Sequence, residues 1–204
     1  MILPLNPAFA DGSSDSESNI INGQVNLQSD ISKVNAQVID VTGNVAAESI
    51  AGGNNAEIVT MNNTNVKNDQ FVGSGADIVS IMNASVKNVG GTVSLDSEAT
   101  CNAVSVSTDP HDVNVNSNQD CNATDPYSQL NASVANTGND VSISGSAIGN
   151  SFEEDTNAPN STVRNFQTNN STEESVVNAS VTNVTGNVGI SSVALGNTAQ
   201  IVHY

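Results

Sequence analysis

The sequence predicts an all-β fold, a β-solenoid of stacked coils, from a fixed repeat and a strand-forming composition. The string Asn-Ala-Ser-Val begins at Asn83, Asn131 and Asn178, and the variant Asn-Ala-Gln-Val begins at Asn35. These copies follow one another after 48, 48 and 47 residues. A constant period of this size indicates a repeat architecture, in which each unit buries its apolar face against its neighbours.

The composition favours strands over helices. Aromatic residues make up 3% of the chain, there is no Trp, and the apolar content is carried by Val, Ala and Ile among abundant Asn, Ser and Thr. β-Branched residues suit strands, small polar residues suit turns, and no 3.6-residue apolar stripe indicates a helix. An acidic chain rich in Asn and Ser is also compatible with disorder, but the regular recurrence of Val and Ile argues against it.

The charge excludes some partners. The formal net charge is −17, and Lys33, Lys67, Lys87 and Arg164 are the four cations. Nucleic acids and anionic lipid surfaces are therefore excluded as partners by repulsion. The acidic residues lack the spacing of a calcium loop, so we expect no metal and no cofactor.

The N-terminus indicates export. Residues 1–10 read as the end of a signal peptide, with a small-x-small pattern before cleavage between Ala10 and Asp11. No stretch approaches the apolar length of a membrane span. We therefore expect a secreted protein at the cell surface or outer membrane, with a flexible leader at 11–21 and a solenoid at 22–204.

A shorter motif, Asn-x-x-Val, predicts the coils. It occurs seven times, and a degenerate copy begins at Asp112. The first copy begins at Asn22, and the other six begin at the Asn residues of a predicted ladder. Long and short intervals alternate, which predicts about eight alternating long and short coils. The predicted Asn ladder consists of Asn35, Asn63, Asn83, Asn131, Asn160 and Asn178.

The positions within the motif alternate between inside and outside. The small residue after the Asn and the constant Val share one strand face and point inward. The residue after Val is Lys67, Lys87 or Arg164 in three copies, which predicts a cationic column facing water. The next position, often Asn, is expected at a bend, where Asn tolerates left-handed backbone and stacks as an amide ladder.

A second motif, Gly-Asn-x-Ala-x-Ile, is expected to form a turn that leads into a half-buried strand. Its last copy contains Gly196, Ala199 and Ile201. This copy lies near the end of the sequence, so we expect it to form an exposed edge strand that can accept a strand from a partner. Pro-containing acidic stretches near 107–112, 124–128 and 152–160 are predicted to be loop insertions.

Cys101 and Cys121 are the two cysteines, 20 residues apart. In a secreted chain this favours a disulfide, which contributes about 3 kcal/mol on the chain-entropy model. A two-Cys metal site is the alternative, but His111 is the one further ligand nearby. Nothing marks either histidine or the acidic runs as catalytic, so we expect no enzyme activity.

The Gly-Asn-Asn-Ala56-Glu-Ile and Gly-Asn-Thr-Ala199-Gln-Ile strings resemble the core of curlin repeats, which form strand–turn–strand units on bacterial surfaces. The Val-Thr-Gly-Asn-Val pattern followed by Ala-Leu-Gly-Asn-Thr-Ala is similar to the holdfast-anchoring surface proteins of stalked alphaproteobacteria. That resemblance implies a curlin-like roll and a role in tethering an adhesive polysaccharide to the envelope. The flanking Ser and the two Gln columns of curlin repeats are largely absent, which favours a discrete solenoid.

The function expected from these observations is adhesion, or anchoring of an extracellular polysaccharide adhesin to the envelope. Its partners would be another copy or homologous surface proteins, bound through the solenoid ends, and polysaccharide. The alternative is a β-helix enzyme acting on acidic polysaccharide, which would hold uronate carboxylates with Lys67, Lys87 and Arg164.

Overall fold

The computed structural model describes residues 18–108, 111–158 and 160–203. These residues form twelve strands and no helix. The strands are β1 (Ser18–Asn26), β2 (Asp30–Val41), β3 (Val45–Thr60), β4 (Thr64–Val72), β5 (Ile78–Val89), β6 (Val93–Thr108), β7 (Val113–Cys121), β8 (Pro126–Thr137), β9 (Val141–Thr156), β10 (Thr162–Asn169), β11 (Glu174–Val184) and β12 (Val188–His203).

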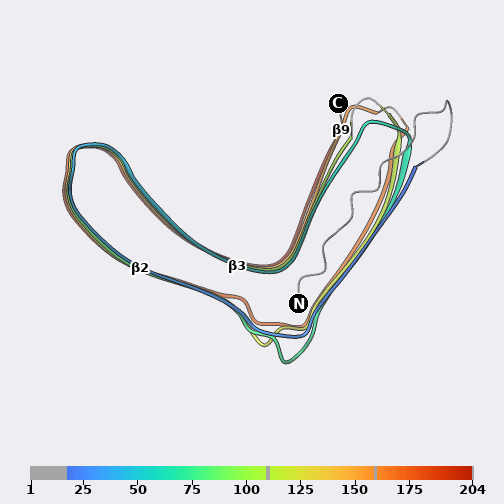
Figure 1. The fold of residues 1–204 in the computed structure, drawn as a ribbon, viewed down its shortest axis with the longest axis horizontal. Helices are drawn as coiled ribbons and strands as arrows, with labels where there is room; N and C mark the ends of the chain where they lie inside the picture. Colours follow the sequence, from blue (N-terminus) through green and yellow to red (C-terminus); the bar gives the residue numbers. More distant parts are fainter. Residues whose placement is uncertain (1–17, 109–110, 159, 204) are drawn as a thin grey trace.

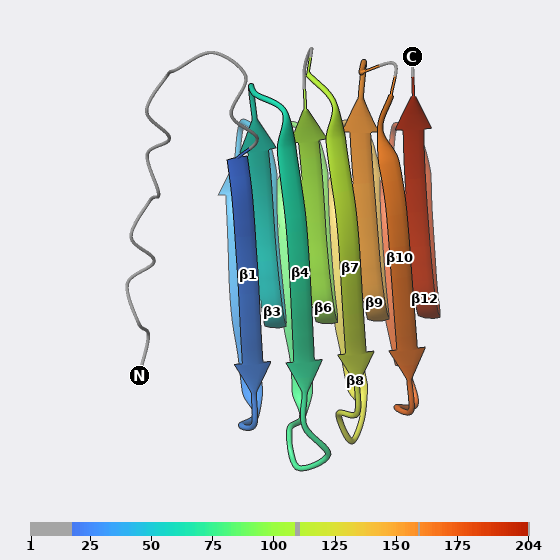
Figure 2. The same ribbon diagram turned by 90° about the vertical axis from the view of Figure 1, so that its right-hand side faces the viewer.

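The strands form three parallel sheets of four strands each. Sheet A has the order β1-β4-β7-β10, sheet B β2-β5-β8-β11 and sheet C β3-β6-β9-β12. Every strand therefore pairs with the strand one coil before or after it, and Figure 2 shows the four strands of sheet A side by side. The predicted all-β solenoid is confirmed.

The expected number of coils is wrong, because the described chain makes four coils of three strands. The Asn-x-x-Val copies lie at two different places in one coil. Asn35 lies in β2 and pairs with Asn83 of β5, whereas Asn63 comes just before β4. The long and short units are thus parts of the same turn of the solenoid.

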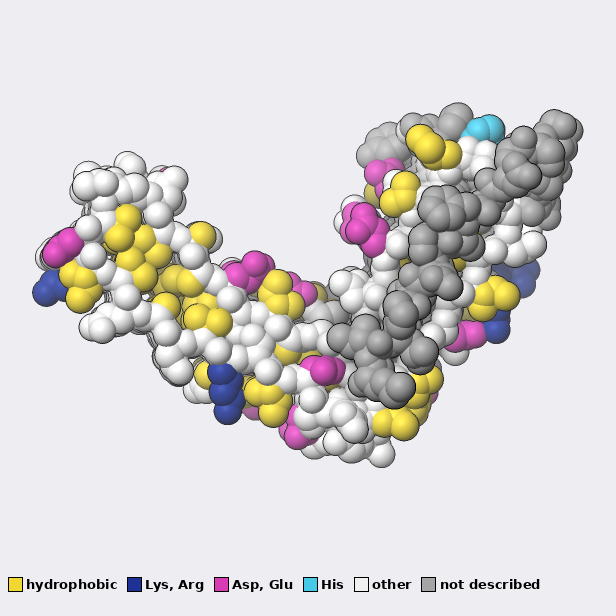
Figure 3. Space-filling model, in the orientation of Figure 1, with side chains coloured by type: hydrophobic (Ala, Val, Ile, Leu, Met, Phe, Trp, Pro, Cys, Tyr) yellow, Lys and Arg dark blue, Asp and Glu magenta, His cyan; other side chains and the backbone are white. Residues whose placement is uncertain are grey.

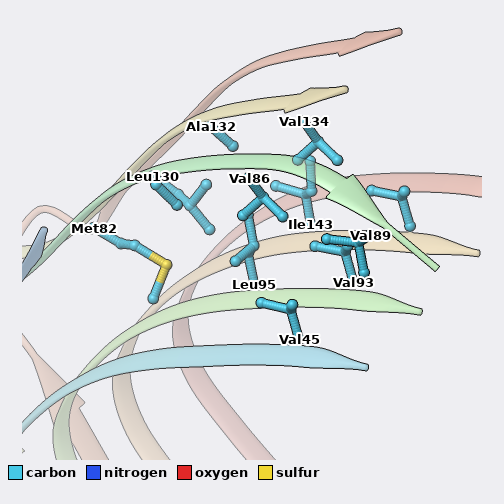
Figure 4. Close-up of a cluster of buried hydrophobic side chains, with 12 residues drawn as sticks. Val45, Met82, Val86, Val89, Val93, Leu95, Leu130, Ala132, Val134 and Ile143 are labelled. Atoms are coloured by element: carbon cyan, nitrogen blue, oxygen red, sulfur yellow. The ribbon is translucent and has the colours of Figure 1, made fainter. Parts of the chain in front are cut away.

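The cross-section of the coil is a bent, elbow-shaped loop with two arms (Figure 1). The first half of each sheet C strand packs against sheet B in one arm, and the second half packs against sheet A in the other. We call the junction of the arms the elbow. Figure 4 shows the core of the first arm, in which Val86, Leu95, Leu130 and Ile143 are almost fully buried.

Alternation of small apolar and polar residues produces this core. In β5, Met82, Ala84 and Val86 are buried while Asn83, Ser85 and Lys87 are exposed. Parallel in-register pairing then stacks similar residues of successive coils on one another, so Val86 lies between Val38 and Val134. Valine columns of this kind fill a thin core without large aromatic side chains.

A left-handed residue interrupts sheet B at the end of each strand. Asp40, Asn88, Asn136 and Asn183 have φ between 53° and 59°. Their side chains form a ladder, with Asn88 donating to Asp40 at 2.7 Å and Asn136 to Asn88 at 2.7 Å. Asn and Asp adopt this backbone at low cost, which confirms the predicted bend and its amide ladder in sheet B. In sheet A the prediction is wrong, because the same motif position falls inside the strands and has no positive φ, at Asn68, Ser117 and Asn165.

All three expected loops are shorter than predicted, because β6 extends to Thr108. Phe152–Thr156 belong to β9, and β8 begins at Pro126, the position in a strand where proline removes no ladder hydrogen bond. Residues 109–110 and 159, inside two of those loops, lie outside the described residues, as do the signal segment 1–10, Ala10, Asp11 and most of the leader. No helix in the described part of the chain could cross a membrane.

Candidate functional site

A buried amide ladder runs through the elbow. Asn54 donates to Asn102, Asn102 to Asn150 and Asn150 to Asn197, each at 2.8 Å. Asn54 and Asn150 also donate across the elbow to carbonyl oxygens of sheet A, on Phe71 and Thr168. These are the Asn of the Gly-Asn motif, which the sequence placed in a turn. That prediction is wrong, because the motif lies in the middle of the sheet C strands.

A glutamine ladder also runs along the solenoid axis, in the arm that sheets A and C form. Gln70 donates to Gln24 at 2.8 Å, and Gln119 to Gln70 and Gln167 to Gln119 at 2.9 Å. The same amides donate across the arm to backbone carbonyls of sheet C, such as Ala103 and Ser151. The chain therefore contains one full Gln column, although the sequence comparison with curlin repeats found such columns largely absent.

Serine hydroxyls bridge sheets B and C in the first arm. Ser80 Oγ lies 2.8 Å from Ser97 Oγ and donates to the Ser49 carbonyl at 2.6 Å. Ser128 donates in the same way to the Ser97 carbonyl at 2.7 Å. These hydroxyls are fully buried, but each is hydrogen-bonded. They therefore hold the two sheets in register with little loss of free energy from desolvation.

Cys101 and Cys121 form a disulfide with a Cα–Cα distance of 6.0 Å, which confirms the predicted pairing. The places of Cys101 and Cys121 in the Gly-Asn-x-Ala region of consecutive units predict equivalent positions in adjacent coils, and that prediction is wrong. Cys101 lies in β6 of sheet C and Cys121 in β7 of sheet A, so they are not equivalent positions of adjacent coils. The bond crosses the elbow among Val72, Ala76 and Ile78, and links the second coil to the third.

The predicted Asn ladder is split between two sites. Asn35, Asn83, Asn131 and Asn178 form one hydrogen-bonded column on the outer face of sheet B, with distances of 2.9 to 3.0 Å. Asn63 and Asn160 lie before sheet A instead, where Asn160 donates its backbone N–H to Asp112 at 3.2 Å. The Asn35 column borders a shallow groove with Ala84 and Ser85.

The predicted cationic column is also split. Lys67 and Arg164 share one column of sheet A, with Asn116 between them. Lys87 lies in sheet B, where it pairs with Ile39 and Ala135. The alternative enzyme reading required the three cations in one line, and the structure does not bring them together.

Sequence reasoning missed Glu154, which points into the core beside the C-terminal strand. Its column is otherwise aliphatic, with Ile58, Val106 and Ile201. The side chain is fully buried, and His203 Nε2 lies 3.3 Å from its Oε2. Burial raises the pKa of Glu154, the His203 charge opposes this, and Asp155 raises the pKa further. Neither carboxylate oxygen accepts a hydrogen bond from the described residues.

The two ends of the solenoid are uncapped in the described part of the chain. Gly196, Ala199 and Ile201 lie in β12, whose described partner is β9 alone, so this strand is an edge. The inward-facing Val188 and Ile190 are 46% and 52% exposed. Figure 3 views the solenoid from the first-coil end, opposite β12, and shows hydrophobic side chains on both arms.

Exposed large apolar residues occur at the ends of the solenoid and not in its middle. Among the described residues, those of the first coil lie between Ile21 and Met61, those of the fourth between Phe166 and Ile201, and the second and third coils contain none. No group of three or more metal-binding side chains occurs in the described ranges. The exposed large apolar side chains of the described residues are thus confined to the first and last coils.

Comparison with known proteins agrees with this geometry. Neither the search of curated proteins nor that of solved structures returned a match. The model of one family, holdfast attachment protein D, matches residues 39–203, which cover most of the solenoid. The chain therefore belongs to the holdfast attachment protein D family, which supports a role in holdfast anchoring at the cell surface.

Proposed function

We propose that this protein is an exported, non-enzymatic structural element that anchors a polysaccharide adhesin to the outer membrane. In this role its solenoid ends join another copy or a homologous surface protein. The observation that carries the proposal is that the hydrogen-bonding groups at the two ends of the solenoid are complementary. Membership of the holdfast attachment family supports the anchoring role.

The amide ladders have a direction, so each leaves a donor at one end and an acceptor at the other. Asn178 uses its Nδ2 toward Asn131, which leaves its Oδ1 for a further donor, and Asn35 has its Nδ2 available at the opposite end. The glutamine ladder has the same direction. Gln167 has its Oε1 left for a further donor at the fourth coil, and Gln24 lies at the opposite end, where its Oε1 already accepts from Gln70. A second copy stacked in register would therefore continue both ladders.

The elbow ladder runs in the opposite sense and is also complementary. Asn54 donates to Asn102, so its Oδ1 faces the open side of the first coil, and Asn197 has a remaining amide hydrogen at the fourth coil. The ladder that begins at Asp40 is the exception. Its carboxylate has no hydrogen to donate to Asn183 of a stacked copy. Three ladders favour head-to-tail stacking and one opposes it.

Apolar burial supplies the driving force for such a contact. Val188, Ile190 and Ile201 of the last coil point inward and are about half exposed. A coil stacked on them would cover these side chains as coils one and three cover their counterparts Val93, Leu95 and Val106 in the second coil. Removal of apolar surface from water stabilises such a contact by about 25 cal/mol per Å².

The experiment tests attachment and assembly together. A strain without the protein should leave its adhesin on the surface and detach. The charged variant Ile190→Lys should fail to restore attachment, and light scattering should show a smaller species than the wild-type assembly. Val193→Lys, an outward-facing change on the same strand, should restore both. Cells that attach normally without the protein would refute the anchoring role.

A further inference from the structure

A groove of about 500 Å³ runs across the outer face of sheet A, the face turned to the viewer in Figure 2. Two outward-facing columns form its walls, and the backbone of residues between them forms its floor. One wall is Asn19, Asn65, Asn114 and Thr162, and the other is Ile21, Lys67, Asn116 and Arg164.

Two cations line the groove of a strongly acidic protein. The groove contains two of the four cations of a chain of net charge −17, and no Asp or Glu lines it. Lys67 and Arg164 are two coils apart, which is about 10 Å at the usual strand spacing. Lys67 contacts Asp69 at 2.7 Å, whereas Arg164 forms no ion pair with a described residue.

Polar and aromatic groups suited to sugars surround the cations. Asn114 donates to Asn65 at 3.0 Å and Asn65 to Asn19 at 3.3 Å, so the amides form a column along the groove. Phe166 lies two residues after Arg164 on the same face of β10 and is 63% exposed. An exposed aromatic ring provides a flat apolar surface on which a sugar ring can stack.

We propose that this groove binds an extended anionic polysaccharide, which lies along the solenoid axis across the coils. Lys67 and Arg164 bind carboxylates of the glycan, the Asn column hydrogen-bonds its hydroxyls, and Phe166 supports one ring. The two-coil spacing is comparable to the length of a disaccharide unit in an extended chain. This inference rests on the proposed anchoring function but concerns the side of the solenoid, whereas assembly uses its ends.

Charge density selects a glycan over a nucleic acid. A uronic acid polymer can place its carboxylates at intervals that match two cations, with neutral hydroxyls between them. A nucleic acid has a phosphate on every nucleotide, and those outside the groove would meet the acidic surface. The groove therefore favours an acidic glycan of moderate charge.

Binding of hyaluronan, which has one carboxylate per disaccharide, to the full-length protein tests the site, with fully methyl-esterified hyaluronan as the neutral probe. The wild type should bind the acidic polymer and bind the ester weakly. The double variant Lys67→Ala, Arg164→Ala should lose about tenfold in affinity, the effect of two exposed ion pairs. Asp69→Asn should bind more tightly, because it frees Lys67, and Phe166→Ala should bind less tightly.

The matched control is Lys33→Ala, Lys87→Ala, which removes the same charge from sheet B. Retained affinity in this control would place the contact in the groove. Equal losses in both double variants would show attraction by net charge alone and refute the site, as would absence of hyaluronan binding or equal binding of single-stranded DNA. Detachment of the deletion strain is a separate readout, so failure of the groove leaves the anchoring role open to its own test.

Discussion

Cys101 and Cys121 are disulfide-bonded across the elbow although they belong to different sheets and successive coils. Cys101 occupies the bend of β6, at the position that is Gly53 in the first coil and Gly149 in the third. The flanking pairs Asn54–Asn102 and Asn102–Asn150 fix that alignment. The bond thus ties the two arms together at the point where the strand changes direction.

Removal of this bond should weaken the solenoid without changing its fold. The Cys101→Ser, Cys121→Ser variant should lose about 3 kcal/mol of unfolding free energy, because a loop of 20 residues is no longer closed in the unfolded chain. Urea denaturation of the variant and of reduced wild type should agree. Unchanged stability in both would contradict this estimate.

The glycines of the elbow are required by space and not by backbone conformation. None of the described glycines has a positive φ. A Cβ on Gly149 would collide with the carbonyl oxygen of Gly196, and one on Gly53 would lie 2.6 Å from the Cys101 oxygen. Backbone atoms of adjacent coils cannot rotate away from such a contact.

Gly149→Ala should therefore destabilise the protein by about 1–3 kcal/mol, the usual cost of overpacking. Gly23→Ala is the matched control, because nothing lies within 4 Å of its Cβ position. Alanine in the control restricts the unfolded chain, so its unfolding free energy should be unchanged or slightly raised. Thermal unfolding of the two variants measures the difference, and equal effects would show that the elbow tolerates a wider coil spacing.

The spacing of the motifs reveals which residues stack but not how many corners a coil has. Asn-x-x-Val suits a half-buried strand in sheet A as well as in sheet B, so equal chemistry at Asn63 and Asn83 suggested equivalent positions. The Gln column was hidden for a related reason. The turns that precede and follow the sheet A strands differ in length, and the intervals between Gln24, Gln70, Gln119 and Gln167 are therefore unequal.

The disulfide and the left-handed bend could be predicted because they depend on composition and local preference. Glu154 could not, since its burial is visible only once it is aligned with Val106 and Ile201. The groove of sheet A likewise depends on the register that brings Lys67 and Arg164 into one column and leaves Lys87 on another sheet.

The buried amide ladder should contribute more stability than the exposed one. Asn150 accepts from Asn102 and donates to Asn197 and to the Thr168 carbonyl. Asn150→Ala leaves the buried Asn102 amide without its acceptor and removes the bonds to Asn197 and Thr168, so it should cost about 2–5 kcal/mol. Asn131→Ala removes two bonds from the solvent-exposed ladder and should cost less than about 1 kcal/mol. Comparable losses in chemical denaturation would mean that both ladders are equally hydrated.

The Glu154–His203 contact should make stability depend on pH. Burial raises the pKa of Glu154 above its unfolded-state value of 4.5. The favourable contribution of the neutral carboxyl is therefore complete below pH 4.5 and is lost as pH rises through the raised pKa. Glu154→Gln stays neutral, so its unfolding free energy should match the wild type in acid and exceed it increasingly toward neutral pH.

His203→Ala separates burial from charge pairing in the same measurement. Without the imidazolium the pKa of Glu154 should rise further, because the attraction that partly offsets burial is gone. The stability difference between His203→Ala and wild type should be absent in acid, where Glu154 is neutral, and should grow as pH rises through the raised pKa of Glu154. A double variant, Glu154→Gln with His203→Ala, should lack both the pH dependence that burial of Glu154 causes and the one that its pairing with His203 causes. If Glu154→Gln instead gave a constant offset at every pH, burial of the carboxylate would not be the cause and the contact would be structural only.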